Sequence, residues 1–168
     1  MAKSFKDYLN QIISGNDLSD NQMTDVMTEI MTGKLSSSQI AGFMIGMRIK
    51  GEAIGEIASA AKVMREHSNS VTLNNRKHLI DTCGTGGDSL QTFNVSTVSA
   101  LIAAAAGARV AKHGGRSVSS KCGSADVLEK IGVNVNLTQE QMTKLVDKIG
   151  IGFMFAPNYH PAMKYVAP

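Results

Sequence analysis

Hydrophobic residues recur at intervals of three and four positions in four separate stretches between residues 5 and 64. This spacing is typical of amphipathic helices. Because the links between the stretches are short, we expect four helices that pack on one another as a small bundle. The four stripes are Phe5, Tyr8, Leu9, Ile12 and Ile13; Met23, Val26, Met27, Ile30 and Met31; Ile40, Phe43, Met44 and Met47; and Ile54, Ile57, Ala58, Ala61 and Met64.

Polar residues at the starts of these stretches also indicate helices. Ser19 with Gln22, and Ser36 with Gln39, have the spacing of a capping box, in which the two residues satisfy each other's backbone N–H groups. Seven of the ten methionines lie before residue 65, which is typical of an adaptable hydrophobic core. Four short helices seldom bury every apolar residue among themselves, so part of this surface can instead form a subunit interface.

After residue 70 the pattern changes to strands that alternate with helices. The polar stretch 69–77 marks a boundary, so we expect a helical domain over residues 1–70 and an α/β domain over residues 71–168. Alternating strands and helices predict a parallel sheet with crossover helices. The expected strands are 79–83, 109–111, 133–135 and 151–155, and the expected helices are one capped by Ser96 or Thr97 that reaches Ala106, one over 125–131 capped by Ser124, and one that follows Thr138.

Composition narrows the class of protein. The 168 residues are 43% hydrophobic, which is too apolar for a disordered chain. No run approaches the ~18 consecutive apolar residues of a membrane span. The two cysteines, Cys83 and Cys122, are too few for a disulfide framework and favour a cytoplasmic protein with reduced thiols. The net charge of +3 lies well below the balance of a typical nucleic-acid-binding protein.

A glycine-rich segment from Asp81 to Asp88 follows the first expected strand and precedes a helix. Its glycines let backbone N–H groups approach an anion, and the start of the helix adds further N–H groups and positive potential. The hydroxyls of Ser96 and Thr97 can bind phosphate oxygens or a hard cation such as Mg²⁺. Asp88 would repel a bare phosphate and therefore suggests a donor such as a ribose hydroxyl. The segment matches neither the dinucleotide fingerprint nor the P-loop, and a plain turn is the alternative for such a loop alone.

A second polar loop, Lys112–Ser120, also follows an expected strand and is rich in Lys, Arg and Ser. Loops at the carboxyl ends of parallel strands share one edge of the sheet, so the two loops should face each other across a crevice. In that position Lys112 and Arg116 indicate a phosphate clamp. By itself, such a basic run would be a solvated surface turn.

Together these motifs resemble those of the anthranilate phosphoribosyltransferase family, over essentially the whole chain. The resemblance implies an N-terminal helical bundle followed by part of a parallel-sheet α/β domain, the architecture of phosphoribosyltransferases and nucleoside phosphorylases. The matching segments are Gly84–Asp88, Asn94–Thr97, Lys112–Ser120, Gly123–Asp126 and Phe155–Lys164.

The resemblance implies transfer of phosphoribose from 5-phosphoribosyl diphosphate (PRPP) to the amine of anthranilate, with release of diphosphate, in tryptophan biosynthesis. It also implies Mg²⁺ as cofactor and a cytoplasmic homodimer joined through the N-terminal helices. Catalysis would consist of orienting the amine and neutralising the leaving diphosphate with Mg²⁺, Lys112 and backbone N–H groups, without a nucleophilic side chain.

Family roles transfer to the positions that match. The residues implied to bind PRPP are Gly84, Gly87, Asp88, Thr92, Asn94, Val95, Ser96, Thr97, Lys112, Ser119, Ser120 and Ser124, with Ser96 also a ligand of Mg²⁺. The residues implied to border anthranilate are Gly84, His113, Gly115, His160 and Met163.

Two departures from the family pattern stand out. Gly115 occupies a position where the family usually has Asn, and the loss of one side-chain hydrogen bond is worth on the order of 1 kcal/mol. The chain also has about half the usual family length. The absent half would carry further acceptor and Mg²⁺ contacts, so we expect the 168-residue chain alone to be inactive or nearly so.

Two other classes of function stay open at this stage. A non-catalytic homologue could bind nucleic acid through the basic residues between Lys112 and Lys121, although no aromatic stacking residues accompany them. A purely structural oligomerisation module would explain the methionine-rich stripes.

Overall fold

The computed structural model describes residues 4–84, 93–117 and 122–166, and its contacts divide the chain into two units. The helical unit comprises Met1–Ser68 with His160–Pro168, and the α/β unit comprises Asn69–Tyr159. The first division lies two residues from the one that we expect from the sequence. Residues 160–168 differ from expectation, because they belong to the helical unit rather than to the α/β domain.

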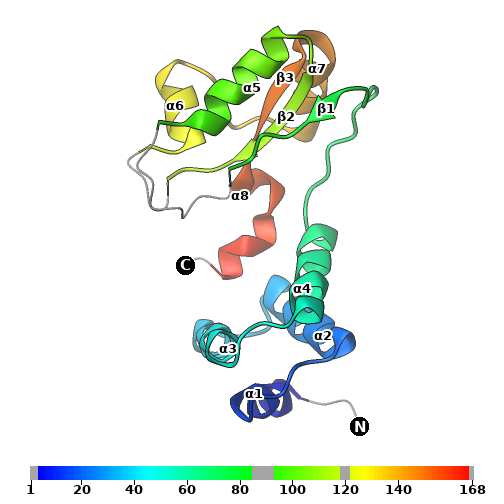
Figure 1. Cartoon of the computed structure of the whole chain (residues 1–168), viewed down its shortest axis with the longest axis vertical. Helices are drawn as coiled ribbons and strands as arrows, with labels where there is room; N and C mark the ends of the chain where they lie inside the picture. The colour runs from blue at the N-terminus through cyan, green and yellow to red at the C-terminus, as the bar shows by residue number, and fades with distance from the viewer. Residues whose placement is uncertain (1–3, 85–92, 118–121, 167–168) are drawn as a thin grey trace. The chain divides into compact units, whose positions relative to one another are not determined.

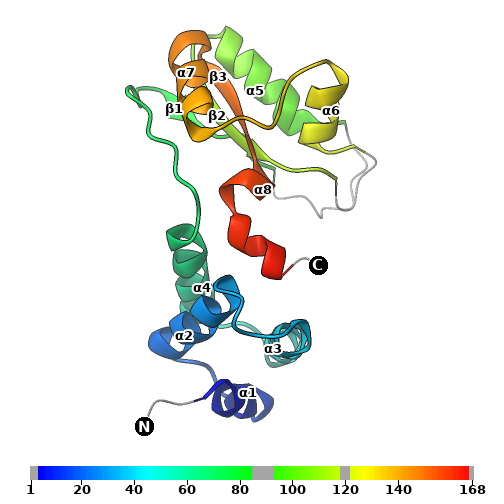
Figure 2. The same ribbon diagram turned by 180° about the vertical axis from the view of Figure 1, so that it is seen from behind.

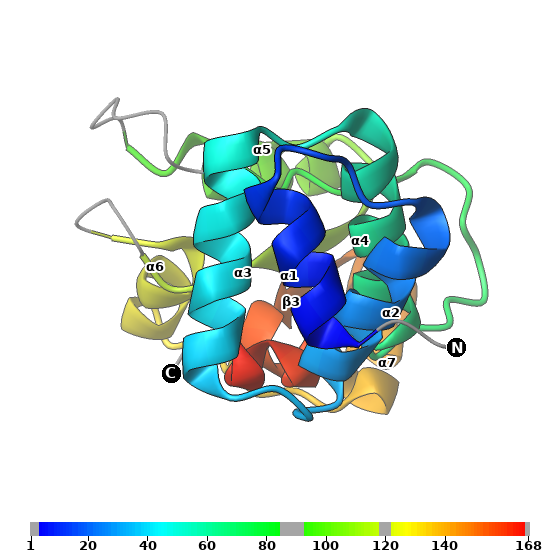
Figure 3. The ribbon, with the colours of Figure 1, turned by 90° about the horizontal axis from the view of Figure 1, so that it is seen from below.

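In the part of the helical unit that the structure describes, there are four α-helices and one 3₁₀ helix (Figure 1). α1 packs on α3, and α2 packs on α4 (Figure 3). The 3₁₀ helix η1 contacts α2, and Ala162, Met163 and Val166 pack against the helical core, which explains why this segment joins the helices. The bounds are α1 Phe5–Ile13, α2 Asp20–Met31, α3 Ser37–Lys50, α4 Ile54–Glu66 and η1 Pro161–Tyr165.

The four helices confirm the predicted stretches, and both predicted capping boxes are present. The predicted apolar face of α4 is wrong, however. Ile54 is 88% exposed and Ile57 is 56% exposed, whereas Glu56, Ser59 and Val63 are buried. The apolar stripe therefore does not decide which side of α4 faces the core.

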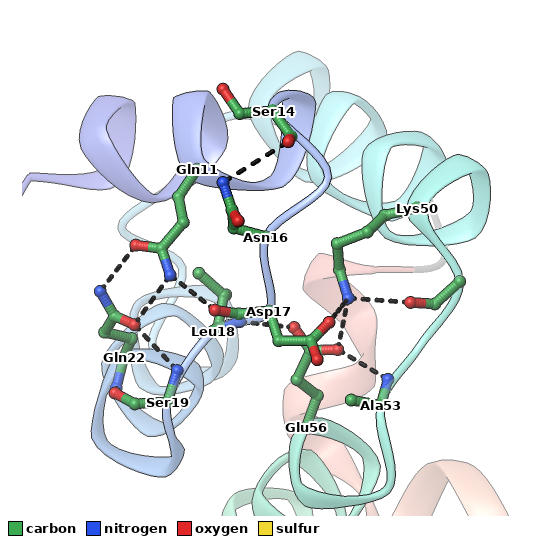
Figure 4. A network of polar contacts seen from close by, with 11 residues as sticks. Gln11, Ser14, Asn16, Asp17, Leu18, Ser19, Gln22, Lys50, Ala53 and Glu56 are labelled. Carbon is green, nitrogen blue, oxygen red and sulfur yellow. Dashed lines mark hydrogen bonds and ion pairs between the residues drawn. The ribbon is translucent and has the colours of Figure 1, made fainter.

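A buried ion pair explains the orientation of α4. The side chains of Glu56 and Lys50 are 1% and 3% exposed, and Lys50 Nζ lies 2.8 Å from Glu56 Oε2 (Figure 4). The carboxylate also accepts hydrogen bonds from the backbone N–H groups of Leu18 and Ala53, each at 2.8 Å. Lys50 Nζ further donates to Asp17 and to the carbonyl of Gly51. One charged pair thus ties together the start of α2, the end of α3 and the start of α4.

Hydrogen bonding sets the charge state of this pair. Burial alone would raise the pKa of Glu56, but the hydrogen bonds from Lys50, Ala53 and Leu18 outweigh it and hold the pKa below its usual value of 4.5. Burial would lower the pKa of Lys50, but its bonds to Asp17 and Glu56 raise it above 10.5. Stability from Glu56 is therefore lost as the pH falls through its lowered pKa, and stability from Lys50 is lost as the pH rises through its raised pKa.

Among its described residues, the α/β unit contains three short parallel strands in the order β1-β2-β3, which confirms the predicted parallel sheet. Leu79 is paired with Arg109, and Lys112 is paired with Phe153. The strands are β1 Leu79–Ile80, β2 Arg109–Gly114 and β3 Ile151–Phe155, and the helices are α5 Val95–Ala105, α6 Ser124–Lys130, α7 Gln139–Ile149 and α8 Ala156–Tyr159.

Helices cover both faces of this sheet. A Cβ at Gly152 would overlap the sulfur of Met142, so Gly152 faces α7 closely. The next residue, Phe153, points to the other face and packs with Leu128 of α6. Lys112, its partner in the register, lies on that second face together with α5. Figures 1 and 2 show α5 and α7 on opposite sides of the strands.

Three strand predictions need correction. Residues 133–135 are not a strand: Asn134 Oδ1 accepts the backbone N–H of Asn136, which gives a turn, and Val135 is buried whereas Val133 is 41% exposed. β1 ends at Ile80, because the Asp81 carboxylate turns the chain by accepting the N–H of Cys83. β2 continues to Gly114, three residues beyond its predicted end, because all five residues of β3 pair with residues 110–114 of β2.

The chain enters and leaves the α/β unit at neighbouring points. Asn69 donates its backbone N–H to the carbonyl of Tyr159 at 2.8 Å and its side-chain amide to the carbonyl of Asn158 at 2.8 Å. The first and last residues of this unit are therefore joined by hydrogen bonds.

Replacing Lys50 by Met should strongly destabilise the protein. The substitution leaves the Glu56 carboxylate buried without its cation, which costs about 3–5 kcal/mol in the free energy of unfolding measured by urea titration. Lys144→Met is the matched control, because it breaks an exposed ion pair with Glu140 that is worth under about 0.5 kcal/mol. Equal losses for the two variants would contradict this account.

Candidate functional site

The candidate site lies where β1 and β2 end and α5 begins. In a parallel sheet these carboxyl ends share one edge, which is the usual place for a ligand. Residues 81–84 follow β1, and Lys112, His113 and Gly114 are the last residues of β2. The sequence predicted Lys112 as the start of a loop; in the structure the strand carries it, so its position is set by the sheet.

Asn94 organises the hydroxyl groups at the start of α5. Its Oδ1 accepts hydrogen bonds from Thr97 Oγ1 at 2.8 Å, from the Thr97 N–H at 3.3 Å and from Ser96 Oγ at 3.2 Å. Ser124 Oγ lies 3.0 Å from Thr97 Oγ1 and 3.4 Å from the same Asn94 oxygen. The expectation that Ser96 or Thr97 caps this helix is wrong, because Asn94 is the N-cap. Both hydroxyls instead lie inside the first turn.

The helix that follows the second loop also starts one residue earlier than expected. Gly123, not Ser124, is the N-cap of α6, and Ser124 is its first residue. A Cβ at position 123 would overlap the backbone of Arg116 and Ser117, so glycine is required there. This close approach brings the Ser124 hydroxyl next to Thr97.

Lys112 brings a cation to these hydroxyls. The residue is 2% exposed, and its Nζ donates to Ser96 Oγ at 3.1 Å and to the Thr82 carbonyl at 3.4 Å. Both acceptors are neutral oxygens. Burial lowers the pKa of Lys112, although Cys83 and Asp81 partly oppose this effect. A nearby anion would relieve the cost of burying this ammonium group, as expected for a phosphate-binding site.

Asp81 connects the two loops, a role that the sequence analysis did not assign. Its Oδ1 accepts the backbone N–H of Cys83 at 2.9 Å and that of His113 at 3.1 Å. Thr82 adds a second link, because its hydroxyl donates to the carbonyl of Ser96 at 2.9 Å. An acidic residue directly after a strand and before a glycine loop is the signal that could have pointed to this role.

Cys83 lies beside His113, with 3.7 Å between Sγ and Nδ1. Burial and the Asp81 carboxylate raise the pKa of the Cys83 thiol, and Lys112 lowers it by less. The thiol is therefore neutral near pH 7.

Arg116 does not take the clamp role that its sequence position suggests. Its guanidinium makes ion pairs with Glu129 at 2.6 Å and Asp126 at 3.1 Å, and it stacks over the ring of Phe155. Asp126 in turn accepts the backbone N–H groups of Gly123 and Ser117. These bonds hold the second loop against α6, so Arg116 shapes the loop and its charge is already compensated.

The predicted site residues fall into three groups. The α/β unit brings together the group at the strand ends and helix starts; a Cβ at Gly84, for example, would lie 3.6 Å from the Cβ of Ser96. This group consists of Gly84, Asn94, Val95, Ser96, Thr97, Lys112, His113, Gly115 and Ser124. His160 and Met163 belong to the helical unit, where Met163 packs against the helical core. Gly87, Asp88, Thr92, Ser119 and Ser120 lie outside the described residues.

Two features are absent from the described ranges. They bring no three His, Cys, Asp or Glu side chains together in a group that could hold a metal ion. Within the same ranges, no helix has both the length and the apolar character to cross a bilayer.

Comparisons with known proteins match both units to domains of a glycosyl transferase family. Residues 6–68 match the model of a "Glycosyl transferase family, helical bundle domain", and residues 76–168 match that of a "Glycosyl transferase family, a/b domain". The anthranilate phosphoribosyltransferase of Chromobacterium violaceum is 61% identical over 160 residues, which are 95% of this chain and 47% of that protein. The one from Methylobacillus flagellatus is 55% identical over 168 residues, which are 100% of this chain and 49% of that protein.

Solved structures give the same result. The crystal structure of anthranilate phosphoribosyltransferase from Thermus thermophilus is similar with a TM-score of 0.86 at 41% identity, over 95% of this chain and 48% of that one. The enzyme from Saccharomyces cerevisiae in complex with PRPP and Mg is similar with a TM-score of 0.87 at 27% identity, over 97% of this chain and 49% of that one. The chain therefore spans about half the length of the relatives it matches.

Removing the Asp81 carboxylate should loosen both loops together. In Asp81→Ala, the amides of Cys83 and His113 lose their acceptor, and one hydrogen bond of about 1 kcal/mol corresponds to roughly five- to tenfold faster hydrogen exchange at each. Asp81→Asn keeps an acceptor oxygen and should restore most of the protection, as measured by NMR.

Asn75→Ala serves as the control for this experiment. Its side chain accepts the backbone N–H of Lys77 in the same unit, away from the site. Exchange at Lys77 alone should increase in this variant. If Asp81→Ala left both Cys83 and His113 protected, the bridging role would be wrong.

Proposed function

Because the chain belongs to the glycosyl transferase family defined by these helical bundle and a/b domains, we propose that it forms the PRPP-binding part of an anthranilate phosphoribosyltransferase. The whole protein would transfer phosphoribose from PRPP to the amine of anthranilate and release diphosphate. A cytoplasmic location and a place in tryptophan biosynthesis go with this proposal. The observation that carries it is the buried ammonium group of Lys112, held against the hydroxyl of Ser96 at the start of α5.

The described residues support binding of a diphosphate. The first turn of α5 lies at the positive end of the helix dipole, and Gly84 brings the backbone of the first loop next to Ser96 without a side chain between them. Lys112 supplies the compensating charge. As diphosphate leaves the ribose, negative charge grows on the diphosphate oxygens. Lys112 and the start of α5 can stabilise this charge without having to move.

Ser96 has the donor set that a hard cation requires. Its hydroxyl proton is directed to Asn94, and one lone pair accepts the bond from Lys112, which leaves a second lone pair. Magnesium in such sites is held mainly by the phosphates of the ligand, with few protein ligands, so a single hydroxyl fits this role. When bound, Mg²⁺ would neutralise part of the diphosphate charge, and Ser96 would hold it next to Lys112.

The acceptor side of the site is proposed from the family resemblance. The residues that we propose to border anthranilate are Gly84, His113, Gly115, His160 and Met163. A Cβ at Gly115 would lie 3.8 Å from the Cβ of Ala156, which is an ordinary contact, so this position has room for a side chain. The fold therefore does not require glycine at position 115, and a glycine there offers no side chain to contact anthranilate.

The same geometry weakens the nucleic-acid alternative. Of the basic residues between 112 and 121, Lys112 is buried and Arg116 is paired with Glu129 and Asp126. The Lys112 charge is therefore shielded from a long polyanion, and the charge of the half-exposed Arg116 is offset by two carboxylates.

Exposed apolar residues of the helical unit support the homodimer. Ile45 and Ile49 lie one turn apart on α3 and are 61% and 82% exposed. Ile13, Met44, Ile54 and Ile57 are also more than half exposed. We propose that a second copy of this chain covers part of this surface, as expected from the methionine-rich helices.

Calorimetric titration tests the binding role of Lys112. With Mg²⁺ present, the chain should bind PRPP, and Lys112→Met should weaken binding about 10- to 100-fold, the usual worth of a hydrogen bond to a charged group. Ser96→Ala should weaken it by roughly tenfold. Lys144→Met, on the exposed side of α7, should have no effect. Binding of duplex DNA at physiological salt, with none of PRPP, would contradict the proposal.

The pH dependence of the free energy of unfolding provides a second test of Lys112→Met. The pKa of Lys112 is lower in the folded chain than the value of 10.5 expected for the unfolded chain. Between these two pKa values the unfolded chain binds more protons, so the stability of the fold rises with pH up to about 10.5. Lys112→Met should abolish this rise and increase the thermal midpoint at pH 7, because it removes a buried ammonium group whose hydrogen bonds go to neutral oxygens.

The dimer is tested by light scattering on the purified chain. Ile45→Glu combined with Ile49→Glu should convert a dimer into a monomer, because two carboxylates would enter an apolar interface. Ile131→Glu, 64% exposed on the α/β unit, is the control and should leave the dimer intact. A monomeric wild-type chain at high concentration would contradict the proposed interface.

A further inference from the structure

We propose that Gly33 is a positioning residue for the acceptor side of the site and acts through the ring of Tyr165, which lies against it. This inference rests on the proposed function, because it concerns His160 and Met163, two of the residues that we propose to border anthranilate. All four residues belong to the helical unit.

Gly33 follows α2 in a conformation that favours glycine. Its φ is +71°, and its backbone N–H donates to the carbonyl of Ile30 at 3.0 Å. The N–H of Lys34 donates to the carbonyl of Glu29 at 2.9 Å, which completes a Schellman motif. Gly15 follows α1 with the same pattern of bonds and a φ of +77°. The backbone conformation is therefore one reason for glycine at both positions.

A close contact with Tyr165 is a second reason for glycine at position 33. A Cβ there would lie 2.6 Å from Cε1 and 2.8 Å from Cζ of the Tyr165 ring, so any other residue would displace the ring. These atoms are the far end of a flexible side chain, so the ring would move rather than α2. A Cβ at Gly15, by contrast, would meet no such neighbour within 4 Å in the described part of the chain.

η1 depends on side-chain contacts for its position. It is a 3₁₀ helix of five residues, in which the N–H of Met163 donates to the carbonyl of His160 at 3.0 Å. Short 3₁₀ helices have poor hydrogen-bond geometry, so this one contributes little stability of its own. Ala162, Met163 and Val166 pack against the helical core and hold one side of the segment.

Tyr165 adds an aromatic contact at the last residue of η1. Its ring lies on Gly33, and Lys164 Nζ lies 4.9 Å from the ring centroid, which is within the range of a cation–π interaction. Tyr165 is 37% exposed, so the ring contact orients η1 at the surface of the unit rather than filling the core. Displacing the ring would therefore move Met163, two positions before it, and His160 at the start of η1.

NMR of the chain labelled at its methionine methyl groups provides the test. In Gly33→Ala, the Met163 signal should shift before any ligand is added. Anthranilate, titrated with PRPP and Mg²⁺ present, should bind roughly tenfold more weakly than to the wild type, because its contacts are misplaced. PRPP should bind as tightly as to the wild type, because the residues described for its binding lie in the α/β unit.

Gly15→Ala is the matched control. It introduces the same unfavourable φ after a helix without displacing a ring. The two variants should therefore lower the thermal midpoint by similar amounts, whereas Gly15→Ala should leave the Met163 signal and anthranilate binding as in the wild type. A purely structural role of Gly33 would change the thermal midpoint alone.

Variants of Tyr165 test the partner of Gly33. Tyr165→Phe keeps the ring and should keep the wild-type affinity for anthranilate. Tyr165→Ala should weaken binding as much as Gly33→Ala does. The double variant should bind anthranilate no more weakly than either single variant, because both substitutions remove the same contact.

Several results would overturn the inference. They are an unchanged Met163 signal in Gly33→Ala, unchanged anthranilate affinity in that variant, and equal effects of Gly15→Ala on either measurement. A wild-type chain that binds PRPP but shows no response of Met163 to anthranilate would also overturn it. Absence of PRPP binding would instead contradict the proposed function, and the ligand-free Met163 signal would still decide whether Gly33 positions η1.

Discussion

The buried ammonium group of Lys112 is the constraint on which the α/β unit depends. Its neighbours among the described residues offer it neutral oxygens, so the folded chain bears a desolvation cost that an anion would relieve. Proteins retain such a cost where binding requires it. The surrounding bonds follow from this need: Asn94 orients the hydroxyls, Asp81 holds the two loops in register, and the strand fixes the start of the lysine side chain.

The helical unit shows a different use of buried charge. Lys50 and Glu56 compensate each other, and backbone N–H groups satisfy the remaining carboxylate oxygens. This pair joins three helix ends, and it overrides the apolar periodicity of α4. A buried pair with all its hydrogen bonds made is structural, whereas a buried cation bonded to neutral oxygens is suited to receive a ligand. The contrast separates the two lysines more clearly than their sequence context does.

Much of the fold could be predicted from the sequence because its local signals are strong. Capping boxes and repeated stripes located α1, α2 and α3, and the alternation of strands and helices predicted the parallel sheet. Three of the failures share one cause, which is hydrogen bonding by single polar side chains. Glu56 turns α4 away from its apolar stripe, Asn134 makes a turn where valines suggest a strand, and Asp81 ends β1 early.

The candidate site was predictable in outline but not in its partners. The spacing of glycines and hydroxyls after the strands indicated an anion site, and the family match agrees with that reading. Spacing could not show that Arg116 forms an ion pair with Glu129, 13 positions away. Nor could it show that Asp81 bridges both loops, because its partner His113 lies 32 positions away. Such long-range partners depend on how α6 and β2 fold back, which local patterns do not encode.

The hydrogen bonds from Asn69 to Asn158 and Tyr159 have a consequence for the order of folding during synthesis. The chain makes a closed detour, Asn69–Tyr159, before it returns with the last pieces of the helical core, Ala162, Met163 and Val166. On the ribosome, the contacts of Ala162, Met163 and Val166 with the helical core are therefore made only after the whole segment Asn69–Tyr159 has been synthesised. The hydrogen bonds that join the two ends of this segment bring those residues back toward the point where the chain left the helices.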